Sequence, residues 1–156
     1  MKNLKLAAFS ACLTFWTVCS IAQNAQGRSV SINEPDYNKP KLFGDLPEQI
    51  NFDPTLLSVL FNTQVGQSVT VSVTQAFTIS GQVVSKAEDA NSTSVVVRLA
   101  NRPGARLVFT KLTSQKNSVK YIGRIISMKH GDGYEITSEN DQYFLKKKGI
   151  YELVTE

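Results

Sequence analysis

The chain has 156 residues, 42% of them hydrophobic, and a formal net charge of +4 at pH 7. This length predicts one domain that can bury a hydrophobic core without help from disulfides or metals. The positive charge is much milder than that of a dedicated nucleic-acid-binding domain, so the composition argues against that class.

Residues 1–22 have the pattern of a secretory signal peptide. Lys2 and Lys5 supply positive charge before an apolar run at residues 6–18. This run is shorter than the roughly 20 apolar residues that span a bilayer as a helix, and small residues favour cleavage after Ala22. We therefore expect an exported chain that is periplasmic, outer-membrane-associated or secreted, with no transmembrane segment after cleavage.

Both cysteines, Cys12 and Cys19, lie inside the predicted signal peptide. Their removal predicts a mature chain without disulfides, zinc–thiolate sites or a cysteine nucleophile. Lipid attachment at Cys19 is the alternative form of processing. It fits less well, because a lipoprotein signal usually has a small residue directly before the cysteine and Leu three positions before it, whereas Trp16-Thr17-Val18 precedes Cys19.

Residues 23–52 are predicted to form an extended segment, here called the strap. Pro35, Pro40 and Pro47 each push the preceding residue towards an extended conformation. The apolar residues of the strap indicate that it docks on the domain, and they are Leu42, Phe43, Leu46, Ile50 and Phe52. We interpret the strap as a cover over one mouth of a barrel. The alternative is an extended peptide offered to the groove of a partner.

A short helix is predicted over residues 53–62, which completes an N-terminal region that spans residues 23–64. Asp53 can cap the free N–H groups, and Pro54 suits the first helical position. Leu56, Val59 and Leu60 are predicted to share the buried face, and Asn62 to end the helix.

From Val65 onward the apolar residues recur with a period of two, which is typical of strands. The predicted strand segments are 65–74, 77–83, 94–99, 107–112, 119–127, 134–137, 143–145 and 150–154. Pro103 and Gly104 predict a type II turn, and central glycines at Gly81 and Gly123 predict sharp bends. The pattern predicts a small antiparallel β-barrel over residues 65–156, similar to the oligonucleotide/oligosaccharide-binding type, with a β-sandwich as the alternative.

Catalytic and metal-binding residues are scarce. The single histidine, His130, lies in a glycine-rich turn beside Asp132, and no G-x-S-x-G nucleophile motif is present. No second histidine or mature cysteine can complete a zinc shell, and the spacing of a calcium loop is missing. We therefore expect no metal, no cofactor and no enzymatic activity.

Basic residues recur within the predicted strands and could form one positive face. The candidates for this basic face are Arg98, Arg106, Lys120 and Arg124. Tyr121 or Tyr143 could supply a stacking surface for a polyanion or oligosaccharide. The alternative is that these are ordinary solvated charges that protect strand edges. Export argues against nucleic acid as the natural ligand.

The stretch from Phe77 to Glu156 resembles small exported proteins of Bacteroidetes-type bacteria. The matching features are Phe77-Thr78-Ile79-Ser80-Gly81, Gly123-Arg124-Ile125-Ile126-Ser127, His130-Gly131-Asp132 and Tyr151-Glu152-Leu153-Val154. In general plan the chain is similar to the potempins. This resemblance implies a small barrel that inhibits secreted peptidases.

An inhibitor of that kind would hold an extended segment in a peptidase cleft. The candidate segment contains Lys39, Pro40, Lys41, Leu42 and Phe43, and its last two residues could fill a hydrophobic pocket. The alternative contacts are the turn of Arg102, Pro103 and Gly104 and the turn of His130 and Asp132. We expect a non-enzymatic protein that binds a protein partner, most concretely a secreted peptidase. The alternatives are a polyanion- or oligosaccharide-binding barrel and a structural accessory of a cell-envelope complex.

Overall fold

A computed structural model describes residues 38–116 and 118–154 of the chain. All of them belong to one unit, Pro35–Glu156. The predicted signal peptide, both cysteines and residues 23–37 of the strap lie outside the described residues.

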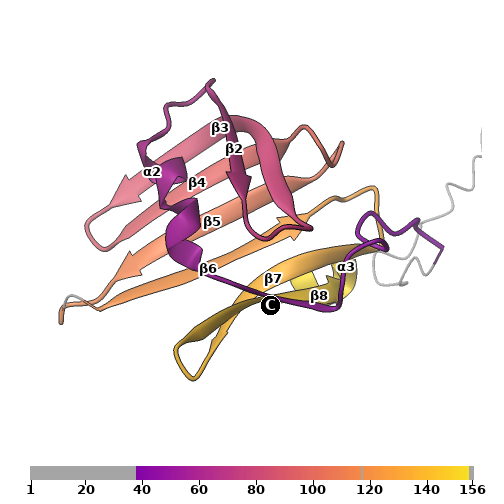
Figure 1. Cartoon of the computed structure of the whole chain (residues 1–156). Coiled ribbons are helices and arrows are strands. Elements are labelled where there is room, and N and C mark those ends of the chain that lie inside the picture. The colour runs from indigo at the N-terminus through magenta and orange to yellow at the C-terminus, as the bar shows by residue number, and fades with distance from the viewer. Residues whose placement is uncertain (1–37, 117, 155–156) are drawn as a thin grey trace, which may run out of the picture. The chain divides into compact units, whose positions relative to one another are not determined.

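Eight strands, two short helices and one 3₁₀ helix make up the described part of the chain (Figure 1). The strands are β1 (Gln49–Phe52), β2 (Ser68–Ser72), β3 (Thr78–Asp89), β4 (Ser92–Leu99), β5 (Arg106–Thr113), β6 (Val119–Ile126), β7 (Asp132–Glu139) and β8 (Gln142–Gly149). The helical elements are η1 (Pro54–Ser58), α2 (Val59–Asn62) and α3 (Ile150–Val154).

The strands form one antiparallel sheet in the order β1-β8-β7-β6-β5-β4-β3-β2. Strands hold 53% of the described residues and helices 12%, and the sheet curls into a half-barrel, so the predicted class of a small antiparallel barrel with a short helix is confirmed. A sandwich would need two packed sheets. The strand order is a simple up-and-down meander, whereas oligonucleotide-binding barrels follow a Greek-key order. Among the eight described strands, the only neighbours distant in sequence are β1 and β8.

The concave side of the sheet holds the core. Alternate residues point inward, and the fully buried ones include Ile79, Val97, Leu107, Phe109 and Ile125. Two glycines let neighbouring strands come close enough for this curl. A Cβ atom at Gly81 would lie 2.1 Å from the Arg98 carbonyl oxygen, and one at Gly123 would lie 2.3 Å from that of Val108.

The predicted helix exists, but its buried face is different. The Asp53 carboxylate accepts a hydrogen bond from the Thr55 N–H at 2.8 Å, and α2 ends at Asn62, as predicted. The first part is a 3₁₀ helix, in which residues three apart share a face. Pro54, Leu57 and Leu60 are therefore buried. The prediction that Leu56 and Val59 are buried is wrong, since their side chains are 45% and 44% exposed.

Two segments adopt a different structure from the predicted one. The prediction of a final strand over residues 150–154 is wrong, because this segment forms α3, with Ile150 and Leu153 buried on one side. An Arg124 guanidinium N–H donates to the Leu153 carbonyl, which satisfies one of the helix's free acceptors. The end of the strap, conversely, is strand β1, which pairs with β8. In both cases tertiary contacts override local propensity.

Candidate functional site

The candidate partner-binding segment at residues 39–43 is fixed to the domain. The carboxylate of Asp132, at the start of β7, accepts hydrogen bonds from the Leu42 N–H at 2.6 Å and the Phe43 N–H at 3.0 Å. The Gly131 N–H donates to the Pro40 carbonyl at 3.1 Å. Phe43 is completely buried, and its ring meets Tyr134 edge to face at 5.3 Å between centroids. Phe43 is thus a core residue and cannot enter a partner's pocket while the chain is folded.

Arg102 fixes the same segment from another turn. Its guanidinium donates to both carboxylate oxygens of Asp45, at 2.9 and 2.6 Å, and to the Leu42 carbonyl at 2.9 Å. The hydrogen bond between the two side chains lowers the pKa of Asp45 and raises the pKa of Arg102. The guanidinium carbon also lies 5.6 Å from the centre of the Phe43 ring. The predicted type II turn is confirmed by the positive φ of 87° at Gly104.

Two further side chains bind the carbonyls that follow. The Lys147 ammonium donates to the Leu46 carbonyl at 2.5 Å and pairs with Glu48 at 3.2 Å, and its side chain is only 8% exposed. The buried Tyr134 hydroxyl donates to the Pro47 carbonyl. Burial raises the pKa of Tyr134 to about 12. We call Arg102, Asp132, Tyr134 and Lys147 the strap clamp.

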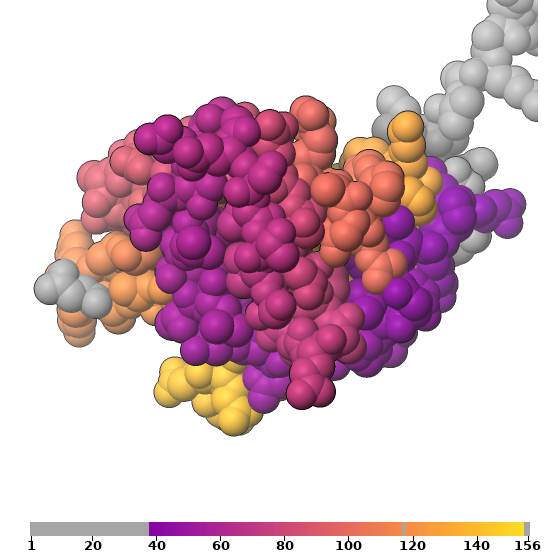
Figure 2. Space-filling view, turned by 45° about the horizontal axis from the view of Figure 1, so that its top comes forward, coloured from indigo at the N-terminus to yellow at the C-terminus, as the bar shows by residue number. Residues whose placement is uncertain are grey.

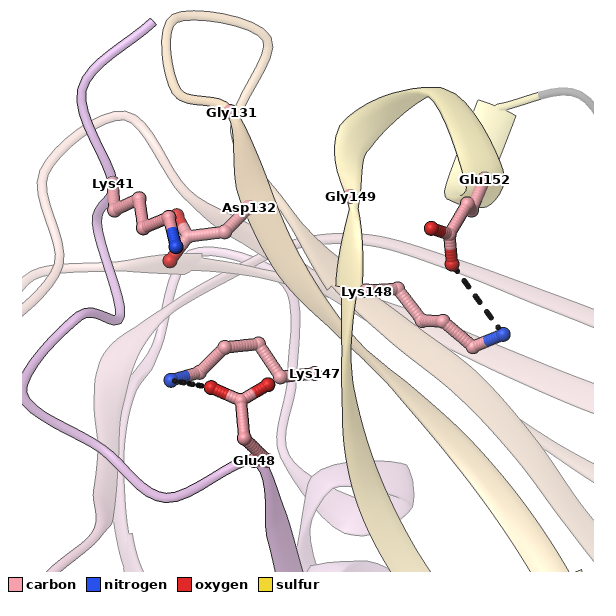
Figure 3. A pocket seen from close by; sticks show the side chains of 8 residues that line it. All are labelled: Lys41, Glu48, Gly131, Asp132, Lys147, Lys148, Gly149 and Glu152. Atoms are coloured by element: carbon pink, nitrogen blue, oxygen red, sulfur yellow. Dashed lines mark hydrogen bonds and ion pairs between the residues drawn. The ribbon is translucent and has the colours of Figure 1, made fainter. Parts of the chain in front are cut away.

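A pocket of about 250 Å³ lies beside this clamp (Figure 3). Its lining alternates cations and carboxylates, and the residues are Lys41, Glu48, Gly131, Asp132, Lys147, Lys148, Gly149 and Glu152. Lys147 points to Glu48, and Lys148 pairs with Glu152 at 3.5 Å. These two ion pairs compensate four of the lining charges within the chain, which weakens the field that the pocket offers to an ionic ligand.

The clamp also accounts for the turn candidates. Asp132 is 3% exposed and carries a structural role, so it is not available to a partner. His130 is half-buried, and its Nδ1 atom lies 2.8 Å from the Ser127 hydroxyl oxygen. Of the candidates in the two turns, Pro103 and Gly104 are the exposed ones.

The four residues of the predicted basic face do share one side of the sheet. Arg98 and Arg106 are direct cross-strand partners on β4 and β5, and the register places Arg124 and Lys120 of β6 on the same outer side. Arg124, however, holds α3 through the Leu153 carbonyl. The cross-strand partner of Arg106 on β6 is Ile126, and Lys120 lies six residues from it. At the rise per residue of a strand, this separation is about 20 Å. Arg98 and Arg106 therefore form a pair, with Arg124 as a diagonal neighbour that is bound to α3 and with Lys120 far along the strand.

The predicted stacking surface lies on the opposite side of the sheet. Tyr121 alternates with Lys120 and Arg124 along β6, so it faces inward, where its ring stacks on Phe109 at 5.4 Å. The Tyr143 hydroxyl accepts a hydrogen bond from the Tyr121 N–H at 3.2 Å. The two tyrosines and the arginines thus cannot contact one ligand together.

A shallow outer pocket of about 380 Å³ adjoins Arg98. It is lined by residues of β2, β3 and the end of β4, and these are Ser68, Ser80, Gly81, Gln82, Arg98 and Leu99, followed by Ala100. Gln82 is the cross-strand partner of Arg98. The sequence reading missed Ser80 and Gln82, although their alternation with buried Ile79 and Val83 was a usable signal.

Within residues 38–116 and 118–154, no group of three His, Cys, Asp or Glu side chains could hold a metal ion. The same part of the chain contains no helix that is long and apolar enough to cross a membrane. Comparisons with protein-family models, curated proteins and solved structures find no match for this chain.

Proposed function

We propose that the chain is an exported, non-enzymatic binding protein that holds an anionic oligosaccharide or similar polyanion on the outer face of its sheet. The observation that carries this proposal is the exposed cross-strand pair of Arg98 and Arg106. Neither arginine forms an ion pair with an acid among the described residues.

An uncompensated pair of this kind has a cost. Like charges directly opposite each other on antiparallel strands destabilise the sheet. An anion between the two guanidinium groups would remove this repulsion, and arginine binds carboxylate, sulfate or phosphate oxygens with two parallel hydrogen bonds. The outer pocket adds Ser68, Ser80 and Gln82, which can bind hydroxyl groups. Charge and hydroxyl recognition together favour an acidic sugar.

The test is binding of an acidic oligosaccharide, such as an oligogalacturonate, measured by calorimetry at several salt concentrations. The double variant Arg98→Ala/Arg106→Ala is expected to bind about tenfold more weakly or worse. Its affinity should also depend less steeply on salt, because fewer ions are displaced. A neutral oligosaccharide of the same length should not compete.

The matched control is Lys116→Ala/Lys129→Ala, which removes the same charge from two exposed positions outside the pocket. It is expected to bind almost like the wild type. If both double variants lost the same affinity, the effect would come from net charge and not from the arginine pair. A wild type without saturable binding would contradict the proposal.

Peptidase inhibition is the second candidate, and one observation favours it. Pro103 and Gly104 are exposed at the tip of their turn, and the ion pair between Arg102 and Asp45 holds this turn in place. A rigid exposed turn loses little entropy when it binds. We expect Pro103→Glu to abolish inhibition of a secreted metallo- or serine peptidase, while Gln115→Glu, in another exposed loop, leaves it intact. A wild-type protein that inhibits no member of a broad panel would eliminate this candidate.

A further inference from the structure

The segment between Asp53 and Lys86 contains no charged side chain, in a chain where 19% of residues are charged. It covers η1, α2, β2 and the first part of β3. Much of it is nevertheless on the surface: η1 lies beside β2, and both face the viewer in the space-filling view (Figure 2). Depletion of charge is a property of the centres of protein interfaces.

Exposed apolar side chains gather on the same segment. Leu56, Val59 and Val65 are 45%, 44% and 58% exposed. Leu56 of η1 and Val59 of α2 both face away from the core. A partner that docks on β2 would therefore also contact apolar side chains beside the strand.

Strand β2 itself is an open edge. Among the residues that the structure describes, it pairs with β3 alone. The Gln67 carbonyl accepts from the Val83 N–H at 3.0 Å, and the Val73 N–H donates to the Phe77 carbonyl at 2.9 Å. Odd-numbered residues therefore direct their backbone groups to β3, and Ser68, Thr70 and Ser72 direct theirs outward. Natural edge strands usually carry charges, prolines or bulges that prevent pairing, and β2 has none of them.

The sequence of β2, Ser-Val-Thr-Val-Ser, reads the same in both directions about Thr70. A two-fold axis at Thr70 would pair this strand with its copy in antiparallel orientation. Threonine would then face threonine, serine would face serine, and valine would face valine. All three outward residues would exchange backbone hydrogen bonds, and hydroxyl and β-branched pairs add to the stability. An uncharged surface can meet its own copy without repulsion.

We infer that β2 is a docking edge for a second copy of this chain, with Leu56 and Val59 at its border. The pairing joins the two sheets into one that runs through both copies, in the isologous arrangement of a two-fold dimer. This inference does not depend on the ligand proposed for Arg98 and Arg106.

The test is sedimentation velocity of the purified protein over a wide concentration range. The wild type is expected to form a dimer whose dissociation constant rises at least tenfold in Thr70→Lys, because two lysines would face each other at the axis. The matched control is Asn51→Lys, which places the same charge at an exposed position of the other edge strand, β1. It should dimerise like the wild type.

A wild type that stays monomeric at every concentration would overturn the inference, as would dissociation by Asn51→Lys instead of Thr70→Lys. A second measurement needs no variant. The Thr70 amide should exchange with solvent rapidly in dilute wild-type protein and slowly at concentrations where the dimer forms. Rapid exchange in the dimer would place the contact elsewhere.

Discussion

Phe43→Ala is expected to lower the free energy of unfolding by about 3–5 kcal/mol, the usual cost of truncating a buried aromatic residue. The Phe43 side chain is fully buried and contacts the Tyr134 ring. Its loss leaves a cavity between the strap and the inner face of the sheet. The change in the free energy of unfolding is measured by urea unfolding that is monitored by far-ultraviolet circular dichroism.

Lys41→Ala is the control, because Lys41 is exposed and lies in the same segment. It is expected to change the free energy of unfolding by less than about 0.5 kcal/mol. This comparison separates a core role for the segment from a partner-binding role. If Phe43→Ala unfolds like the wild type but loses a binding partner, the residue serves recognition and the assignment to the core is wrong.

Asp132→Asn is expected to destabilise the protein by about 2–4 kcal/mol, since hydrogen bonds to a charged group are the strong ones and buried donors are costly to leave unpaired. The carboxylate accepts from two backbone N–H groups, those of Leu42 and Phe43. An asparagine amide keeps one acceptor oxygen and turns its NH₂ group towards the other donor. Hydrogen exchange of the Leu42 and Phe43 amides should therefore accelerate together with the loss of stability.

Asp141→Asn makes the same chemical change in the exposed turn between β7 and β8. Asp141 has a φ of 62°, and asparagine is well tolerated in this left-handed region. The control should match the wild type in both measurements. Unchanged exchange at Leu42 and Phe43 in Asp132→Asn would show that the carboxylate does not hold the strap.

The two variants probe how the strap is attached to the domain. Two members of the strap clamp, Arg102 and Asp132, are predicted from the sequence as contacts for a partner. Arg102 and Asp132 are polar residues in turns rich in glycine and proline, and such turns often bind partners. In the folded chain they bind the strap instead. Lys147 and its neighbours Lys146 and Lys148 each have a carboxylate partner in the chain, and these partners are Glu48, Glu139 and Glu152, respectively.

What the sequence determined by itself is local. The class of the sheet follows from the period of two, the turn at Pro103-Gly104 follows from the φ preferences of its two residues, and the start of the helix follows from Asp53 and Pro54. The common face of Arg98 and Arg106 was also predictable, because alternation along each strand decides which side a residue takes.

Only the tertiary structure decided which polar side chains are free. Asp45 is 57 residues from Arg102, Leu42 is 90 from Asp132, and Leu46 is 101 from Lys147. No local pattern reports such distant partners, because they depend on where the strap lies on the curled sheet. The same holds for the helix, where a 3₁₀ start shifted the buried face from Leu56 to Leu57. Periodicity predicts which elements form, and packing determines which of their residues remain available for binding.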